Sequence, residues 1–225
     1  MAQVTAHSIA ARVHGTYWVH STTPPPSPPS PLLIGFHGYG ESAERHLAEL
    51  VKIPGIDGWT VAAVQALHPF YTRTQEVVAS WMTRFDRERA IADNTQYAVD
   101  VAAELRARLG DAPLVFVGFS QGAAMAFRAA AGCLRQGWRV GGVVALGGDV
   151  PPDVADAGLS GFPPVMLGGG LREPWYTPAK LEQDRALLAS SGVDVQAVAY
   201  DGGHEWTDEF RGFVGEFLSG ILLRR

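Results

Sequence analysis

Six short apolar runs alternate with longer segments of helical periodicity along this chain of 225 residues. The apolar runs span residues 32–36, 59–64, 114–117, 140–146, 164–167 and 193–200. Runs that are apolar on both sides of the strand are typical of parallel sheets that helices cover on both faces. The alternation therefore predicts an α/β fold with a mostly parallel central sheet and helices on both faces.

The segments between these runs carry apolar residues at helical spacing. The clearest is 87–109, in which residues 91, 98, 101, 105 and 109 are apolar. A last helix is predicted over about 207–222, with Phe210, Phe213, Val214, Phe217 and Ile221 turned inward. Because no long insertion interrupts the predicted strands, we expect little or no lid over the sheet.

The first thirty residues carry weaker signals. Apolar and polar positions alternate enough over 8–20 to predict an opening strand or hairpin. Six of the eight residues at 24–31 are prolines, which predicts an extended loop. An SH3-type partner could bind this loop, but a surface connection between two strands is favoured. The N-terminal strands are too short to stand alone, so we expect a single domain over 1–225.

Composition narrows the class of protein. The chain is 47% hydrophobic and 18% charged, which is typical of ordinary globular proteins. A net charge of −5 offers no basic face for nucleic acid. The single cysteine, Cys133, lies in an apolar helical stretch and is interpreted as a core residue. No leader-like N-terminus and no apolar run of about 18 residues occur, so a cytoplasmic enzyme without integral membrane association is expected.

The most informative motif is Gly118-Phe119-Ser120-Gln121-Gly122, which follows an apolar run and precedes an alanine-rich helical stretch. In a G-x-S-x-G turn between a strand and a helix, the serine sits on a sharp, strained turn with its hydroxyl exposed. The glycines let neighbouring backbone segments approach closely. The motif predicts a serine hydrolase with Ser120 as the nucleophile.

A serine hydroxyl needs a base within hydrogen-bond reach, usually a histidine whose tautomer a carboxylate fixes. The chain order expected after this type of turn is serine, acid, histidine. His204 follows a predicted strand and fits that order, whereas the other six histidines all precede Ser120. His204 is therefore the predicted base.

The acid is expected in the loop after the run at 164–167. Glu173 is the only carboxylate in that loop, and a glutamate can replace the more usual aspartate. Two aspartates remain as alternatives, Asp149 after an earlier strand and Asp201 close to His204 in the sequence. The non-catalytic alternative for Glu173 is a solvated surface charge that pairs with Arg172.

Acyl transfer also needs two preorganised donors for the developing oxyanion. The residue after the nucleophile supplies one backbone N–H, here that of Gln121. A loop after an early strand supplies the other, and the sequence Phe36-His37-Gly38-Tyr39-Gly40 favours the N–H of Tyr39. We expect His37 to brace this loop.

These motifs together resemble the phospholipase/carboxylesterase family of α/β-hydrolases, which includes acyl-protein thioesterases and small bacterial esterases. The resemblance covers about residues 32–222. It implies an α/β-hydrolase fold, a catalytic triad of Ser120, Glu173 and His204, and oxyanion donors at Tyr39 and Gln121. The sequence departs from the family at Glu173, where members usually carry aspartate.

The expected reaction is hydrolysis of small carboxylic esters of short to medium chain through an acyl-enzyme, without cofactor or metal. Aromatic residues expected near the rim of the site are Tyr39, Phe70, Tyr71, Trp81, Trp175, Tyr176 and Trp206. Of these, Trp81, Trp175, Tyr176 and Trp206 are predicted to bind substrate. The alternatives are a thioesterase or lysophospholipase with the same triad, or a non-catalytic binding protein of this fold, as monomer or homodimer.

Overall fold

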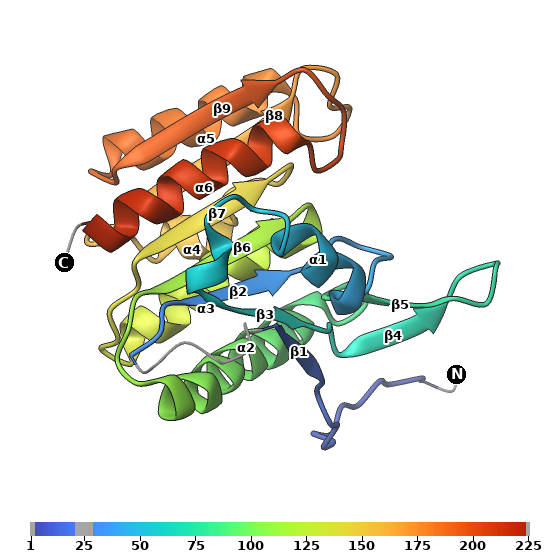
Figure 1. Ribbon diagram of the computed structural model, residues 1–225. Coiled ribbons are helices and arrows are strands. Elements are labelled where there is room, and N and C mark those ends of the chain that lie inside the picture. Colours follow the sequence, from blue (N-terminus) through green and yellow to red (C-terminus); the bar gives the residue numbers. More distant parts are fainter. Residues whose placement is uncertain (1–2, 21–28, 224–225) are drawn as a thin grey trace.

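The computed structural model describes residues 3–20 and 29–223, and its centre is a seven-stranded sheet (Figure 1). The strands are, in their order across the sheet, β1 (Tyr17–His20), β3 (Thr60–Val64), β2 (Leu32–Phe36), β6 (Leu114–Phe119), β7 (Gly142–Leu146), β8 (Val165–Gly170) and β9 (Val195–Tyr200). Within this described sheet, the edge strand β1 pairs antiparallel with β3 and the other neighbours are parallel. The mostly parallel sheet expected from the sequence is confirmed.

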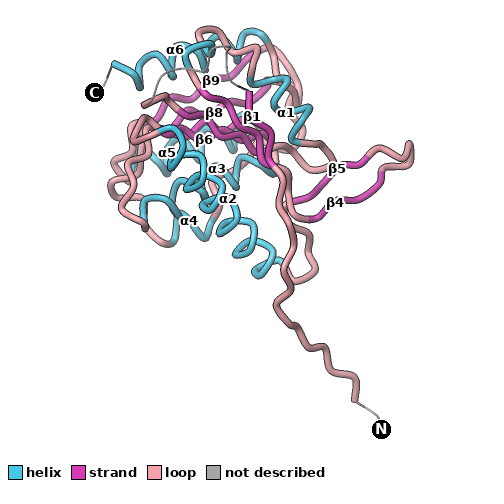
Figure 2. Tube along the Cα trace, turned by 60° about the horizontal axis from the view of Figure 1, so that its bottom comes forward, coloured by secondary structure: helices cyan, strands magenta, loops and turns pink. Residues whose placement is uncertain are grey.

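Helices cover both faces of the sheet (Figure 2). One face carries α2 (Arg87–Leu109), α3 (Gln121–Arg135), α4 (Pro152–Asp156) and α5 (Pro178–Ser190). The other face carries α1 (Ala43–Leu50) and α6 (Asp208–Leu223), with the short 3-10 helix η1 (Ile56–Gly58) beside them. The helix predicted over 87–109 is confirmed at both ends. In that part of the chain that the structure describes, no helix is long and apolar enough to cross a membrane.

The central strands are apolar throughout because both of their faces are covered. In β6, Leu114 and Phe116 pack into the core on the side of α2 and α3, whereas Val115 and Val117 pack against α6. Successive side chains of a strand point to opposite faces, so a buried parallel strand needs apolar residues at every position. Cys133 is fully buried in α3, as expected for a core residue.

The N-terminal prediction was too long. Residues 3–16 form no regular structure, and the strand comprises only Tyr17–His20. Ile9 is 93% exposed and Val13 is 64% exposed, because this segment extends away from the sheet (Figure 2) and has no surface to pack against. Most of the proline-rich segment, residues 21–28, lies outside the described residues.

A hairpin of β4 (His68–Tyr71) and β5 (Val77–Ser80) connects β3 to α2 and projects from the body of the molecule (Figures 1 and 2). This hairpin was not predicted from the sequence. The base of the hairpin is joined to the loop after β2 by two backbone hydrogen bonds. The Gly40 N–H donates to the Ala79 carbonyl (3.0 Å), and the Ala79 N–H donates to the Glu41 backbone carbonyl (2.9 Å). This attachment places the end of β5 beside the carboxyl edge of the sheet.

Candidate active site

The predicted site residues gather at one edge of the sheet. Tyr39, Ser120, Glu173 and His204 follow β2, β6, β8 and β9 respectively. These strands run parallel, so their carboxyl ends lie at the same edge, where reactive groups of open α/β sheets collect.

Ser120 occupies a strained turn between β6 and α3. Its backbone has φ 55° and ψ −119°, a conformation that residues other than glycine rarely adopt. A Cβ on Gly122 would lie 2.0 Å from the Phe36 carbonyl oxygen, and one on Gly118 would lie 2.1 Å from the Gly122 carbonyl oxygen. Both glycines are therefore required by close backbone approach, which explains the G-x-S-x-G spacing in physical terms.

Glu173 and His204 form a hydrogen-bonded pair in which Glu173 is buried and His204 is partly buried. The imidazole Nδ1–H donates to Glu173 Oε2 at 2.5 Å, and the carboxylate side chain is completely buried. The other oxygen, Oε1, accepts from the backbone N–H groups of Trp175 (2.9 Å) and Tyr176 (3.3 Å). Because Nδ1 is the donor, Nε2 is left as a proton acceptor.

The two alternative acids have other partners. Asp149 pairs with Lys180 at 3.4 Å, and Asp201 pairs with Arg172 on the surface. Both aspartates are more than half exposed. Neither contacts His204 in the described structure, so Glu173 is the carboxylate that fits the role of triad acid.

Two aromatic rings hold the His204 ring in place. The Phe119 ring lies 4.7 Å from it between centroids, and the Trp175 ring contacts it edge-on at 4.8 Å. With Glu173 behind it, the imidazole is fixed on three sides. Such support keeps a general base in one orientation.

Ser120 and His204 line a common cavity of about 510 Å³. No hydrogen bond links the Ser120 hydroxyl to the His204 ring in the described structure. Catalytic hydrogen bonds are often long or misaligned without substrate and tighten in the Michaelis complex. The shared cavity places the predicted nucleophile and the predicted base at one reaction space.

The two expected oxyanion donors are free. In the part of the chain that the structure describes, the N–H groups of Tyr39 and Gln121 have no hydrogen-bond acceptor. The neighbouring Gly38 N–H is occupied, because it donates to the Glu41 carboxylate at 2.7 Å. Burial raises the pKa of Glu41. A role for Glu41 was not predicted from the sequence, although Glu41 follows Gly40 in the loop after β2.

His37 braces the same loop, in agreement with its expected structural role. Its Nδ1–H donates to the Gly38 carbonyl (2.7 Å), and its Nε2 accepts from the Ala66 N–H (3.1 Å). The indole N–H of Trp81 donates to the His37 carbonyl at 2.8 Å. This arrangement requires a neutral imidazole, and burial lowers the pKa of His37 to about 4.

The buried histidines predict loss of stability in acid. Burial lowers the pKa of His46 to about 3 and that of His37 to about 4, below the value of about 6.5 for the unfolded chain. Below pH 6.5 the unfolded state therefore binds more protons, and each histidine lowers the free energy of unfolding by about 1.4 kcal/mol per pH unit. Urea unfolding at pH 7.5 and pH 5.0 should show a combined contribution of about 4 kcal/mol lost at the lower pH.

The variant His46→Leu separates one contribution from the rest. Between pH 7.5 and 5.0 its free energy of unfolding should fall by about 2 kcal/mol less than that of the wild type, because leucine cannot be protonated. The control is His68→Gln, since His68 is exposed and its replacement should leave the pH dependence unchanged. An identical pH dependence in His46→Leu and the wild type would contradict the assignment.

The four predicted substrate-binding aromatics divide into two pairs. Trp175 and Tyr176 line the cavity. Trp81 and Trp206 do not. The Trp81 ring is fully buried behind the loop after β2, where it contacts Phe36. The structure corrects these two assignments, because the Trp206 ring packs on the α1 and α6 side of the sheet, 5.9 Å from His46.

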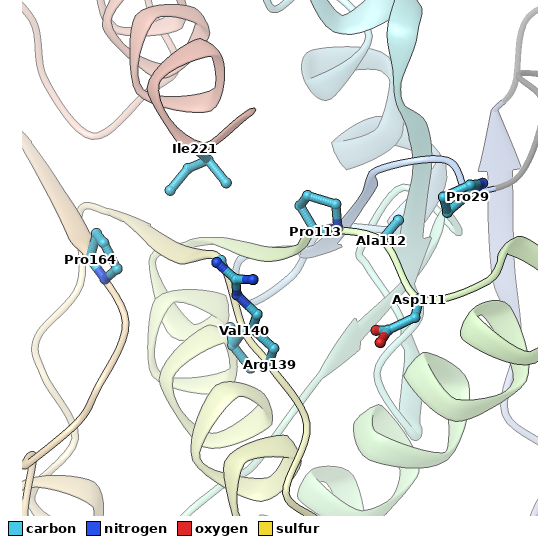
Figure 3. A pocket seen from close by; sticks show the side chains of 9 residues that line it. Pro29, Asp111, Ala112, Pro113, Arg139, Val140, Pro164 and Ile221 are labelled. Atoms are coloured by element: carbon cyan, nitrogen blue, oxygen red, sulfur yellow. The ribbon is translucent and has the colours of Figure 1, made fainter. Parts of the chain in front are cut away.

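A larger cavity of about 570 Å³ lies at the opposite edge of the sheet, near the amino ends of β6, β7 and β8 (Figure 3). Its wall is formed by loop residues such as Pro113, Val140 and Pro164, with Ile221 of α6 above them. No serine, histidine or cysteine lines it in the described structure, so size alone does not mark the reactive site. Among the described residues, no three His, Cys, Asp or Glu side chains cluster as metal ligands.

Comparisons with known proteins agree with this architecture. A model of the thioesterase domain family matches residues 49–160. No curated protein matches the chain in sequence. The solved structure of esterase PE8 is 23% identical, with a TM-score of 0.73 over 93% of this chain and 100% of that one.

Two further solved structures are similar. Acyl-protein thioesterase 2 of Zea mays is 18% identical, with a TM-score of 0.70 over 93% of this chain and 100% of that one. The Bacillus cereus carboxylesterase is 19% identical, with a TM-score of 0.70 over 92% of this chain and 94% of the other. By its fold, then, this chain is similar to solved carboxylesterase and acyl-protein thioesterase structures, with a mostly parallel sheet that helices cover on both faces.

Proposed function

We propose that the protein is a serine hydrolase that cleaves carboxylic esters of short to medium acyl chain. The observation that carries this proposal is the hydrogen-bonded Glu173–His204 pair, whose imidazole lines the same cavity as Ser120. The esterase and thioesterase structures of the same fold support a hydrolytic reaction. The site lies within one α/β-hydrolase domain, which is the domain organisation that we propose for residues 1–225.

In the first half of the reaction, the Ser120 hydroxyl rotates toward His204 and attacks the ester carbonyl carbon. His204 Nε2 takes the hydroxyl proton, and Glu173 stabilises the imidazolium through Nδ1–H. The negative charge that develops on the carbonyl oxygen is stabilised by the free N–H groups of Tyr39 and Gln121. The C–O bond to the alcohol then breaks, and the imidazolium protonates the departing oxygen.

In the second half, a water molecule attacks the acyl-enzyme formed on Ser120. His204 takes one proton from the water and returns it to the serine oxygen as the acid leaves. The same N–H donors stabilise the second tetrahedral intermediate. In this cycle His204 accepts and then donates each proton that is transferred.

The cavity supports substrates of modest size. A volume of about 510 Å³ falls within the range of small-molecule sites. Its apolar wall includes Met82, Ala124 and Val150 beside the Trp175 and Tyr176 rings. Such a wall suits an acyl chain of a few carbons.

A second candidate is thioester hydrolysis, which the match to the thioesterase domain family over residues 49–160 favours. A thioester carbonyl requires the same nucleophile, base and oxyanion donors. Lysophospholipid hydrolysis would also use this triad. A non-catalytic protein of the same fold is the candidate from a different class.

The test is labelling by a fluorophosphonate probe, followed by rate measurements on 4-nitrophenyl butyrate, butyryl-CoA and lysophosphatidylcholine. We expect one covalent adduct, located at Ser120 by peptide mass spectrometry, and the highest kcat/KM on the 4-nitrophenyl ester. A preference for butyryl-CoA would favour the thioesterase. A folded protein that forms no adduct and cleaves none of the three substrates would refute a serine hydrolase of any kind.

A further inference from the structure

The cavity beside Ser120 has an excess of positive charge. Its lining includes four cations, namely Arg84, Arg87, Arg128 and Lys180. Within the described residues, Asp149 is the one carboxylate in the same lining. The whole chain has a net charge of −5, so this local sign is opposite to that of the protein.

Two of the four cations already have partners. Arg128 is almost fully buried and makes a bidentate ion pair with Asp153, with N–O distances of 2.9 and 2.7 Å. Lys180 lies 3.4 Å from Asp149. Each of these two charges is therefore neutralised by a neighbouring carboxylate.

Arg84 and Arg87 are different. In the described structure, neither guanidinium has a hydrogen bond or an ion pair. Arg87 contributes only a longer-range attraction to Asp153, which it shares with Arg128. Two acids flank Arg87 in the sequence, Asp86 and Glu88. Asp86 pairs with Arg89, and neither acid lines the cavity. Two unpaired guanidinium groups therefore lie at the cavity that holds the nucleophile.

The segment that carries Arg84 is anchored to the nucleophile turn. The Gln121 side chain accepts from the Trp81 N–H (2.8 Å) and donates to the Met82 carbonyl (2.9 Å). From the other side, the buried Asn94 amide donates to the Trp81 carbonyl at 2.9 Å. Arg84 follows Met82 by two residues, so its backbone is held at a fixed place relative to Ser120.

We propose that the ester substrate carries an anionic group, a carboxylate or a phosphate, that Arg84 and Arg87 bind while its carbonyl lies at Ser120. This inference rests on the proposed function. Guanidinium groups bind carboxylates and phosphates through paired, charge-assisted hydrogen bonds. A cleft lined by one sign of charge also raises the rate of encounter with ligands of the opposite sign.

The test compares esters that are matched except for charge. The first pair is mono-4-nitrophenyl succinate and 4-nitrophenyl butyrate, and the second is 2-(butyryloxy)ethyl phosphate and 2-hydroxyethyl butyrate. We expect kcat/KM to be at least tenfold higher for the anionic member of one pair, mainly through KM. The pair that shows the preference distinguishes a carboxylate on the acyl side from a phosphate on the alcohol side.

The double variant Arg84→Gln/Arg87→Gln should reduce this anionic-to-neutral ratio at least tenfold. The control is Arg89→Gln, because Arg89 lies on the same helical turn but not in the cavity lining, and it should keep the wild-type ratio. Equal rates within both wild-type pairs, or the same ratio in the double variant and the wild type, would overturn the proposal.

A binding measurement keeps the inference separate from the reaction. Calorimetric titration of the Ser120→Ala protein with monobutyl phosphate and with succinate should give heat from at least one anion. Adding Arg84→Gln/Arg87→Gln should weaken that binding at least tenfold. Anion binding that depends on the two arginines, together with a wild-type protein that hydrolyses no ester, would support the anion site and refute the ester reaction. Ester hydrolysis by the wild type without anion binding by Ser120→Ala would do the reverse.

Discussion

Replacing Ser120 by alanine should lower kcat for 4-nitrophenyl butyrate by about 10⁶-fold, the loss measured when the nucleophile of a comparable triad is removed. In the proposed mechanism the hydroxyl oxygen forms the bond to the acyl group, and among the described residues no other side chain of the cavity lining is a serine or a cysteine. The variant should also form no adduct with a fluorophosphonate. The measurement is the rate at saturating ester together with the mass of the intact protein after labelling.

The control is Ser190→Ala at the exposed end of α5, which should keep the wild-type rate. A second variant, Ser120→Gly, should be equally inactive but more stable than Ser120→Ala by about 1 kcal/mol. The reason is that glycine adopts φ 55° without strain, whereas alanine does not. Substantial activity in either Ser120 variant would show that another residue is the nucleophile.

The stability of the serine turn and its chemistry are linked. A positive φ at a residue with a side chain costs about 1–3 kcal/mol and persists only where the surroundings enforce it. Here the Ser120 N–H donates to the Leu146 carbonyl of β7 at 2.8 Å, and close packing at Gly122 fixes the start of α3. The fold thus holds the hydroxyl at a tip that an unstrained chain would not present.

The sheet could be predicted from the sequence because its central strands have an unambiguous signal. Leu114–Phe119 is buried on both faces, and that requirement shows directly as an unbroken apolar run. The α2 helix could be predicted for a similar reason, since one of its faces must be apolar along 87–109. Each signal comes from a segment that packs on a large surface.

The hairpin and the edges lack such a signal. In β4, Phe70 is half-buried and its neighbours are exposed, so the segment has no apolar pattern that differs from a loop. Its position depends on the hydrogen bonds between Ala79 and the loop after β2, which join residues far apart in the sequence. The error around Ile9 and Val13 was the opposite one, since a strand was predicted there and none forms. An alternating pattern leads to a strand only where a partner strand exists, and both side chains are exposed.

Chain order was sufficient to propose Ser120 and His204 as reacting groups, but it did not indicate the residues that support them. Glu41 and Asn94 act through contacts to Gly38 and Trp81, and no spacing in the sequence indicates those contacts. The Trp206 prediction was wrong because its closeness to His204 in sequence did not reveal which face of the sheet its ring would join. Sequence order leads to candidate reacting groups, whereas the supporting contacts depend on the folded geometry.

Replacing Glu173 by glutamine should lower kcat by about 10⁴-fold while the protein stays folded, as measured when a triad aspartate is changed to asparagine. The amide oxygen can still accept from the Trp175 and Tyr176 N–H groups, which leaves an NH₂ group facing His204 Nδ1. That NH₂ group favours the imidazole tautomer with its proton on Nε2. This tautomer cannot take the proton of Ser120, and the imidazolium would lack its negative partner.

The matched controls are Asp201→Asn and Asp149→Asn, each the same removal of charge from a carboxylate near the site. Both should keep kcat within about twofold of the wild type, because Asp201 pairs with Arg172 and Asp149 with Lys180, away from the imidazole. A full rate in Glu173→Gln together with a large loss in either aspartate variant would transfer the acid role to that aspartate. A full rate in all three variants would mean that His204 acts without a carboxylate, in contradiction to the 2.5 Å contact at its Nδ1.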